Sequence, residues 1–88
     1  MKYAKAPHRP RKRSVMIAGH ATSISLEDEF WEELCRIAEA EGRTISALLT
    51  EIDETRGPRS LSSAARVYVL EYLKKQLKGR PFLWDQSG

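Results

Sequence analysis

The 88-residue chain has a single cysteine, Cys35, and no long hydrophobic run. One cysteine excludes an intrachain disulfide, and we expect a protein of the reducing cytoplasm. No apolar run approaches the roughly 20 residues of a membrane-spanning helix, so no membrane partner is expected. The apolar stretch 15–18 is too short for the core of a signal peptide. A hydrophobic content of 41% predicts one small folded domain.

The chain also lacks the residue patterns of an active site. Cys35, His8 and His20 do not have metal-ligand spacing, and no phosphate-cradling glycine loop is present. No nucleophile and base stand out as a pair. We therefore expect no enzyme activity, no metal and no cofactor. Cys35 is expected to be a small residue of the core, since it belongs to an apolar stripe.

Charge is distributed unevenly along the chain. Residues 1–26 carry six Lys/Arg and no acid, residues 27–55 carry ten acids and two arginines, and residues 56–88 carry seven Lys/Arg and two acids. A block of one sign usually seeks a partner of the opposite sign. The basic ends therefore favour a polyanion as partner, although solubility and salt bridges between subunits would also explain them.

Hydrophobic periodicity predicts one short strand and three helices. Residues 21–26 alternate, with Thr22, Ile24 and Leu26 on one face and Ala21, Ser23 and Ser25 on the other. Helical spacing follows over about 27–41, 45–55 and 61–78. Residues 14–18 could add a few extended residues before a bend at Gly19-His20. The expected organisation is a flexible basic arm at 1–13, a domain at 14–78 and a tail at 79–88.

A lone strand needs a neighbour for its backbone N–H and C=O groups. Little else in the sequence reads as strand, so we expect the neighbour to be the same strand of a second copy. A chain of this size has a marginal core by itself, and dimerisation is a usual remedy. The third helix is apolar on several sides, which also favours cover from a partner subunit. The sequence thus predicts a homodimer that is mainly helical.

The order strand, helix, glycine-containing turn, helix resembles the ribbon-helix-helix DNA-binding family. The resemblance lies in the length and apolar spacing of residues 22–52, in the turn 41–44, and in the wording Gly19-His20-x-Thr22-Ser23-x-Ser25-Leu26-Glu27-x-x-Phe30-Trp31. The longer wording is similar to a small bacterial subgroup that also carries a segment like 61–64. The resemblance covers about residues 14–73.

The resemblance implies an intertwined homodimer whose paired strands enter the major groove of double-stranded DNA. Position by position, it assigns the base contacts to Ala21, Ser23 and Ser25. Several better-known members of the family place Arg, Lys, Gln or Asn at these positions, whereas this chain has one alanine and two serines. Serine can bond to several base edges and therefore discriminates weakly between bases. Ser25 also fits a capping box with Asp28.

The start of the second helix is a candidate phosphate site. The resemblance implies that free amides clamp a phosphate there, and the helix dipole favours anions at this end. Ile45 and Ser46 would donate their backbone N–H groups, Thr44 would cap the helix, and Arg43 would add charge. Simple capping by Thr44, without DNA, is the alternative.

Further contacts to DNA are expected from the basic arm. Its densest cluster comprises Arg9, Arg11, Lys12 and Arg13. Such an arm can follow phosphates or enter a minor groove, or it can remain solvated or recruit an acidic partner. His20 is a candidate base or phosphate contact, a pH-sensitive group or a turn residue.

The sequence as a whole predicts a dimeric, nucleoid-associated regulator of transcription, most simply a repressor. The alternative is a protein-interaction or antitoxin-like module that uses the third helix and the tail. Phe82, Leu83 and Trp84 in the tail would either dock on the domain or bind a protein partner.

Overall fold

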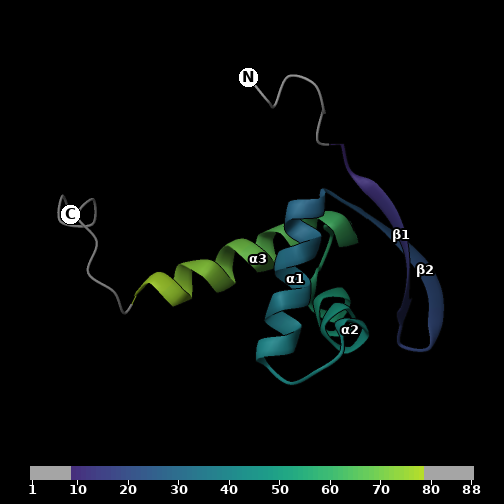
Figure 1. The fold of residues 1–88 in the computed structure, drawn as a ribbon. Coiled ribbons are helices and arrows are strands. Elements are labelled where there is room, and N and C mark those ends of the chain that lie inside the picture. The colour runs from purple at the N-terminus through teal and green to yellow at the C-terminus, as the bar shows by residue number, and fades with distance from the viewer. Residues whose placement is uncertain (1–8, 79–88) are drawn as a thin grey trace.

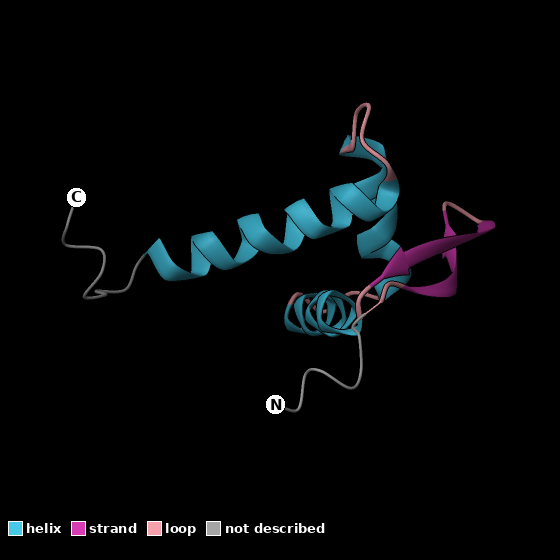
Figure 2. Ribbon diagram, turned by 90° about the horizontal axis from the view of Figure 1, so that it is seen from above, coloured by secondary structure: helices cyan, strands magenta, loops and turns pink. Residues whose placement is uncertain are grey.

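The computed structural model describes residues 9–78. In these residues, two strands precede three helices: β1 Arg11–Ile17, β2 His20–Leu26, α1 Asp28–Ala40, α2 Ile45–Thr55 and α3 Leu61–Lys78. The hairpin lies along one side of the helices, and α3 extends away from them on the opposite side (Figures 1 and 2). The expected mainly helical fold, with a two-stranded antiparallel ribbon and a third helix, is confirmed.

The second strand of the ribbon comes from the same chain. β1 pairs with β2 from Arg11 opposite Leu26 to Ile17 opposite His20. The expectation that the neighbour of β2 is a strand of a second copy, because little else in the chain would form a strand, is therefore wrong for this structure, whose ribbon is an intrachain hairpin. The expectation failed because β1 begins in a run of arginine and lysine, which hides its alternation. Residues 11–13 are strand rather than flexible arm, whereas residues 1–8 lie outside the described range.

A two-residue turn makes the hairpin possible. Ala18 and Gly19 join the strands with φ of 51° and 83°, which is the pair of positive values that a type I′ turn requires. Gly19 adopts such a φ without penalty, but Ala18 is an L-residue in the left-handed region. The twist of this turn matches that of the strands, so a short connection suffices.

Each helix begins or ends with a recognisable cap. Gly42 has a φ of 70°, and the amide of Arg43 donates to the Ala38 carbonyl while that of Gly42 donates to Glu39. This is a Schellman ending for α1. Thr44 and Ser60 accept hydrogen bonds from Ala47 and Ser63 and so cap α2 and α3. The cap at Thr44 confirms the sequence expectation.

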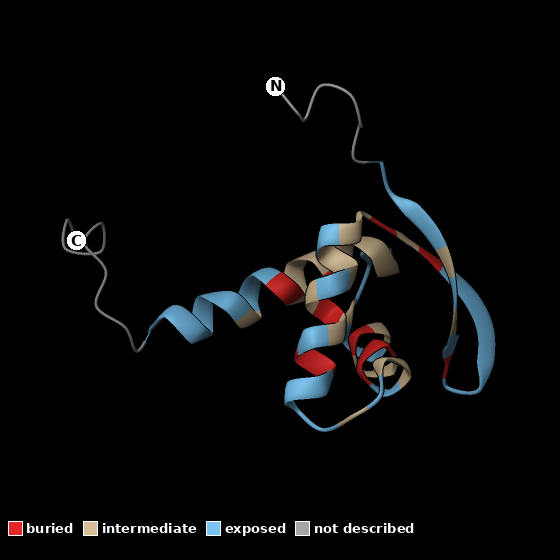
Figure 3. Cartoon of the chain, viewed as in Figure 1, coloured by how far each residue is buried: buried red, intermediate tan, exposed pale blue. Residues whose placement is uncertain are grey.

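The core lies where the ribbon and the three helices meet (Figure 3). Ile24 and Leu26 of β2 face inward, as their alternation predicted. They pack with side chains from all three helices: Leu34, Ile37, Ala38, Leu48, Leu49, Ile52, Ala64, Ala65 and Val69. The distal half of α3 is mostly exposed, so that helix has a buried start and an uncovered end.

Candidate nucleic-acid interface

The outward face of the ribbon consists of six side chains, three from each strand. Residues directly opposite one another in a ladder point to the same face. Ala21, Ser23 and Ser25 of β2 therefore share this face with the β1 residues opposite them, which are Met16, Ser14 and Lys12. All are exposed except Ser25, which is half-buried. The predicted outward set is thus brought together on one accessible surface, hereafter the outward face.

Sequence reasoning missed Ser14 and Met16 as members of this face. Met16 is 49% exposed. The missed signal was the alternation of residues 14–17 immediately before a two-residue turn containing glycine. The face is small and polar at its centre, with one positive charge at Lys12.

Ser25 does not cap α1. Its backbone N–H donates to the hydroxyl of Ser62 in α3, at 3.2 Å, and Glu27 occupies the N-cap without a side-chain cap bond. The capping-box interpretation of Ser25 and Asp28 is therefore wrong. Ser62 instead fixes the edge of β2 that β1 does not cover.

His20 stands apart from the outward face. It pairs with Ile17 beside the turn and therefore points to the opposite side of the ribbon, where its side chain is exposed. It borders an open hollow lined also by Thr22, Asp53 and Arg56. The turn itself consists of Ala18 and Gly19, so the expected bend at Gly19-His20 lies one residue earlier and His20 is the first residue of β2.

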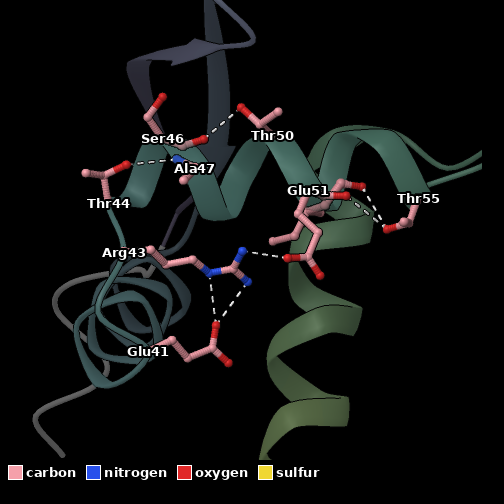
Figure 4. Close-up of polar contacts among 9 residues, drawn as sticks. Glu41, Arg43, Thr44, Ser46, Ala47, Thr50, Glu51 and Thr55 are labelled. Carbon is pink, nitrogen blue, oxygen red and sulfur yellow. Dashed lines mark hydrogen bonds and ion pairs between the residues drawn. The ribbon is translucent and has the colours of Figure 1, made fainter.

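The N-terminus of α2 lies against β1, as Figure 4 shows. The hydroxyl of Ser46 donates to the Met16 carbonyl, and the amide of Ala18 donates to Thr50 Oγ1. The Thr44 hydroxyl accepts a hydrogen bond from the backbone amide of Ala47, at 3.0 Å. These bonds hold the first turn of α2 next to the ribbon.

Two first-turn amides of α2 remain open. Within residues 9–78, no acceptor bonds the backbone N–H of Ile45 or of Ser46. Open amides at this end of a helix carry partial positive charge and bind anions. The structure therefore places a potential anion-binding site close to the ribbon.

Arg43 is tied to carboxylates rather than free. Its guanidinium contacts Glu41 at 3.0 Å and Glu51 at 2.6 Å (Figure 4). The hydrogen bond to Glu51 is the main cause that raises the pKa of Arg43. Two neighbouring carboxylates offset its charge, so Arg43 fastens the α1–α2 turn onto α2.

The basic cluster is divided between two sides of the ribbon. Arg11 and Arg13 both reach Asp28 of α1, at 3.2 and 2.7 Å. Arg13 also lies over the ring of Trp31, 4.7 Å from its centroid. Lys12 instead belongs to the outward face, and Arg9 is exposed just before β1. Only Lys12 and Arg9 of the four are without an ion pair in the described part of the chain.

No other chemistry is evident in the described residues. No three His, Cys, Asp or Glu side chains within 9–78 gather in a way that could hold a metal ion. Cys35 is half-buried, and burial is the main cause that raises the pKa of its thiol. No helix in this range is long and apolar enough to cross a membrane.

Comparison with known proteins points to one family. The model of the ribbon-helix-helix domain matches residues 10–73. The solved structure of an uncharacterized protein from Bordetella pertussis Tohama I is similar, with a TM-score of 0.69 and 29% identity. That match covers 93% of this chain and 72% of the other. No curated protein matches. Since the domain model spans most of the sequence, the chain belongs to the ribbon-helix-helix family, a family of DNA-binding transcription regulators.

Proposed function

We propose that this protein is a dimeric repressor of transcription that inserts the outward face of a two-stranded ribbon into the major groove of DNA. The observation that carries the proposal is the exposed outward face itself, with serines at its centre and a lysine at one end. Two strands about 5 Å apart fit a groove about 12 Å wide. Small side chains allow the backbone to approach the base edges closely.

Affinity in this proposal comes mainly from phosphates. The open amides of Ile45 and Ser46 lie beside the ribbon and would bind one phosphate. Lys12 and Arg9 would bind others. Ser14, Ser23 and Ser25 would make weak base contacts, so we expect modest sequence selectivity and strong dependence on salt. Such a protein would be associated with the nucleoid.

A lysine substitution tests the position of the DNA. Lys12→Gln removes a charge from the outward face, and Lys74→Gln removes one from α3, where Lys74 is 63% exposed. Binding to a duplex selected from random DNA is measured between low and near-physiological salt. Lys12→Gln should reduce the slope of log affinity against log salt by about one for each lost phosphate contact.

The control should leave that slope unchanged. Equal slopes for wild type, Lys12→Gln and Lys74→Gln would place the DNA elsewhere on the molecule. Absence of any duplex that the wild-type protein enriches from random DNA would contradict selective regulation.

A second candidate function is binding of a protein through α3. Leu70, Leu73 and Leu77 recur at helical spacing on its distal half and are 53%, 39% and 37% exposed. Exposed leucines in a row are typical of interaction surfaces. The tail residues Phe82, Leu83 and Trp84, which the sequence also offers as contacts for a protein partner, lie outside the described residues. Leu73→Gln should then abolish capture of a protein partner by the full chain and leave DNA binding intact, with Lys75→Gln as control.

A further inference from the structure

The outward face changes from polar to apolar along the ribbon. Its cross-strand pairs are Lys12 with Ser25, Ser14 with Ser23, and Met16 with Ala21 beside the turn. The last pair, hereafter the apolar pair, has no hydrogen-bond donor in either side chain, and the methionine thioether is only a weak acceptor. Ribbon and DNA would therefore meet through hydroxyls and a charge at one end and through apolar atoms at the other.

Position, more than exposure, distinguishes Met16. More than half of a folded surface is apolar, so an exposed methionine does not by itself indicate a contact. Met16, however, lies between Val15, which packs against the core, and the buried Ile17, so alternation turns it outward. Ala21, opposite Met16, ends in a single methyl group. The Met16 side chain therefore projects beyond its neighbour, toward whatever the outward face meets.

Hydrogen bonds with α2 hold the backbone around Met16. The Ser46 hydroxyl donates to the Met16 carbonyl, and the Ala18 amide donates to Thr50 Oγ1 at 3.1 Å. Within residues 9–78, Ser46 also has one of the two open amides in the first turn of α2. One residue thus joins the candidate phosphate contact to the candidate base contact, and the fold sets the distance between them.

One open hollow reaches both of these contacts. Its walls include Met16 and Ala21 of the ribbon and Ile45 and Ser46 of α2, and Trp31 adds apolar surface. A phosphate bound at the α2 amides would hold its DNA strand at this hollow, with a base edge within reach of the apolar pair. Phosphate contacts fix the register of a protein on DNA, and base contacts then read the sequence.

We propose that the apolar pair recognises the C5-methyl group of thymine in the major groove, with Met16 as the residue that gives the outward face its sequence preference. This assignment rests on the proposed function, because it names the base that the ribbon reads. Among the groups that base pairs present in the major groove, the thymine methyl is the apolar one. It is therefore the group that a pair without donors can favour.

The other base edges would lose hydrogen bonds to water at this position. Guanine presents two acceptors and cytosine an amino donor, and neither finds a good partner on Met16 or Ala21. A desolvated polar group without a partner destabilises the complex. A thymine methyl instead buries apolar surface against Met16, whose flexible side chain adapts to a small group. We expect the selected DNA to carry thymine rather than cytosine opposite the apolar pair.

Deoxyuridine tests the contact directly, since it keeps every hydrogen-bonding group of thymine and lacks only the C5-methyl. Wild-type protein and Met16→Ala are compared on the duplex that the wild type selects from random DNA, with its thymines replaced one at a time. Where the thymine faces Met16, the wild-type affinity should fall about fourfold, the value of one buried methyl group. Met16→Ala should bind the thymine duplex more weakly and should lose less than about twofold on the same replacement.

Two further variants serve as controls. Met16→Leu keeps an apolar side chain at the position and should retain most of the response to the methyl group. Ser14→Ala changes the same strand and the same face two residues away, and should retain the response whatever its own affinity. Both positions are exposed, so urea midpoints close to that of the wild type would show that the variants fold.

The role of Met16 is contradicted if no thymine of the selected duplex responds to loss of its methyl group. It is also contradicted if Met16→Ala responds as strongly as the wild type does. Loss of the response in Ser14→Ala as well would assign it to general weakening of the complex, and Met16 would then have no special role.

Failure of the proposed function would look different. A wild-type protein that binds no duplex contradicts DNA binding as such. A protein that selects a duplex, with a salt slope that falls in Lys12→Gln, yet ignores every thymine methyl contradicts only the role of Met16.

Discussion

Individual side chains in this small domain often connect two elements. Arg66 of α3 contacts Glu27 at 2.9 Å, immediately before α1, and also lies over the Phe30 ring at 5.7 Å. Arg13 connects β1 to Asp28 and Trp31 in the same manner. Arginine suits both tasks because its planar group can pair with a carboxylate and stack on an aromatic ring.

The Glu27 carboxylate should make stability depend on acid pH. A hydrogen bond from its own backbone amide, and then the bond from Arg66, lower its pKa below the ordinary 4.5. A carboxyl whose pKa is lower in the folded state stabilises the fold above its unfolded pKa, and that contribution is lost as the pH falls through the folded value. Glu27→Gln should therefore lose less stability than wild type between about pH 5 and pH 3.

Urea midpoints measured across that range would check this expectation. Glu33→Gln is the control, since Glu33 pairs with the exposed Arg36 on the surface of α1. Parallel acid limbs for wild type and Glu27→Gln would show that the Arg66 contact does not contribute.

At the scale of elements, β2 lies between β1 and α3. One edge of the strand pairs with β1, and the Ser25 amide on the other edge is held by the Ser62 hydroxyl. The shape of the ribbon thus depends on α3, a helix that follows it by 35 residues. This gives the third helix a structural role beyond that of an exposed arm.

Ser62→Ala should destabilise the domain by roughly 1 kcal/mol, the cost of leaving a partly buried amide without its partner. The neighbouring Ser63→Ala serves as control, because it makes the same serine-to-alanine change in helix propensity without removing the bond to Ser25. Free energies of unfolding from urea titration would distinguish them, and equal values for both variants would contradict a role for Ser62 in fixing the edge.

The helices and β2 were predictable because each carries its own local signal. Periodicity placed all three helices, and the capping residue Thr44 marked where α2 begins. β1 was missed because Arg11, Lys12 and Arg13 look like a charged arm. Arg13 can nevertheless lie on the inward side of the strand, because Asp28 of α1 neutralises its charge. A contact between residues so far apart in sequence has no local signature.

At the scale of the whole molecule, ribbon and distal α3 project to opposite sides of a compact core (Figure 2). The outward face of the ribbon was predictable from alternation, since Ala21, Ser23 and Ser25 had to share one side. The internal pairing of Arg43 was not predictable, because it depends on how α1 turns into α2. The separation of the ribbon from distal α3 agrees with the two proposed functions, with DNA at the ribbon and a protein partner at distal α3.

The central claim is that DNA meets the outward face of the ribbon. The most direct measurement is the affinity for a selected duplex of Ser23→Asp, compared with Gln76→Glu, which adds the same charge on the exposed distal part of α3. We expect Ser23→Asp to weaken binding at least tenfold with unchanged folding, and Gln76→Glu to bind as wild type does. Equal affinity of the two folded variants would contradict the account.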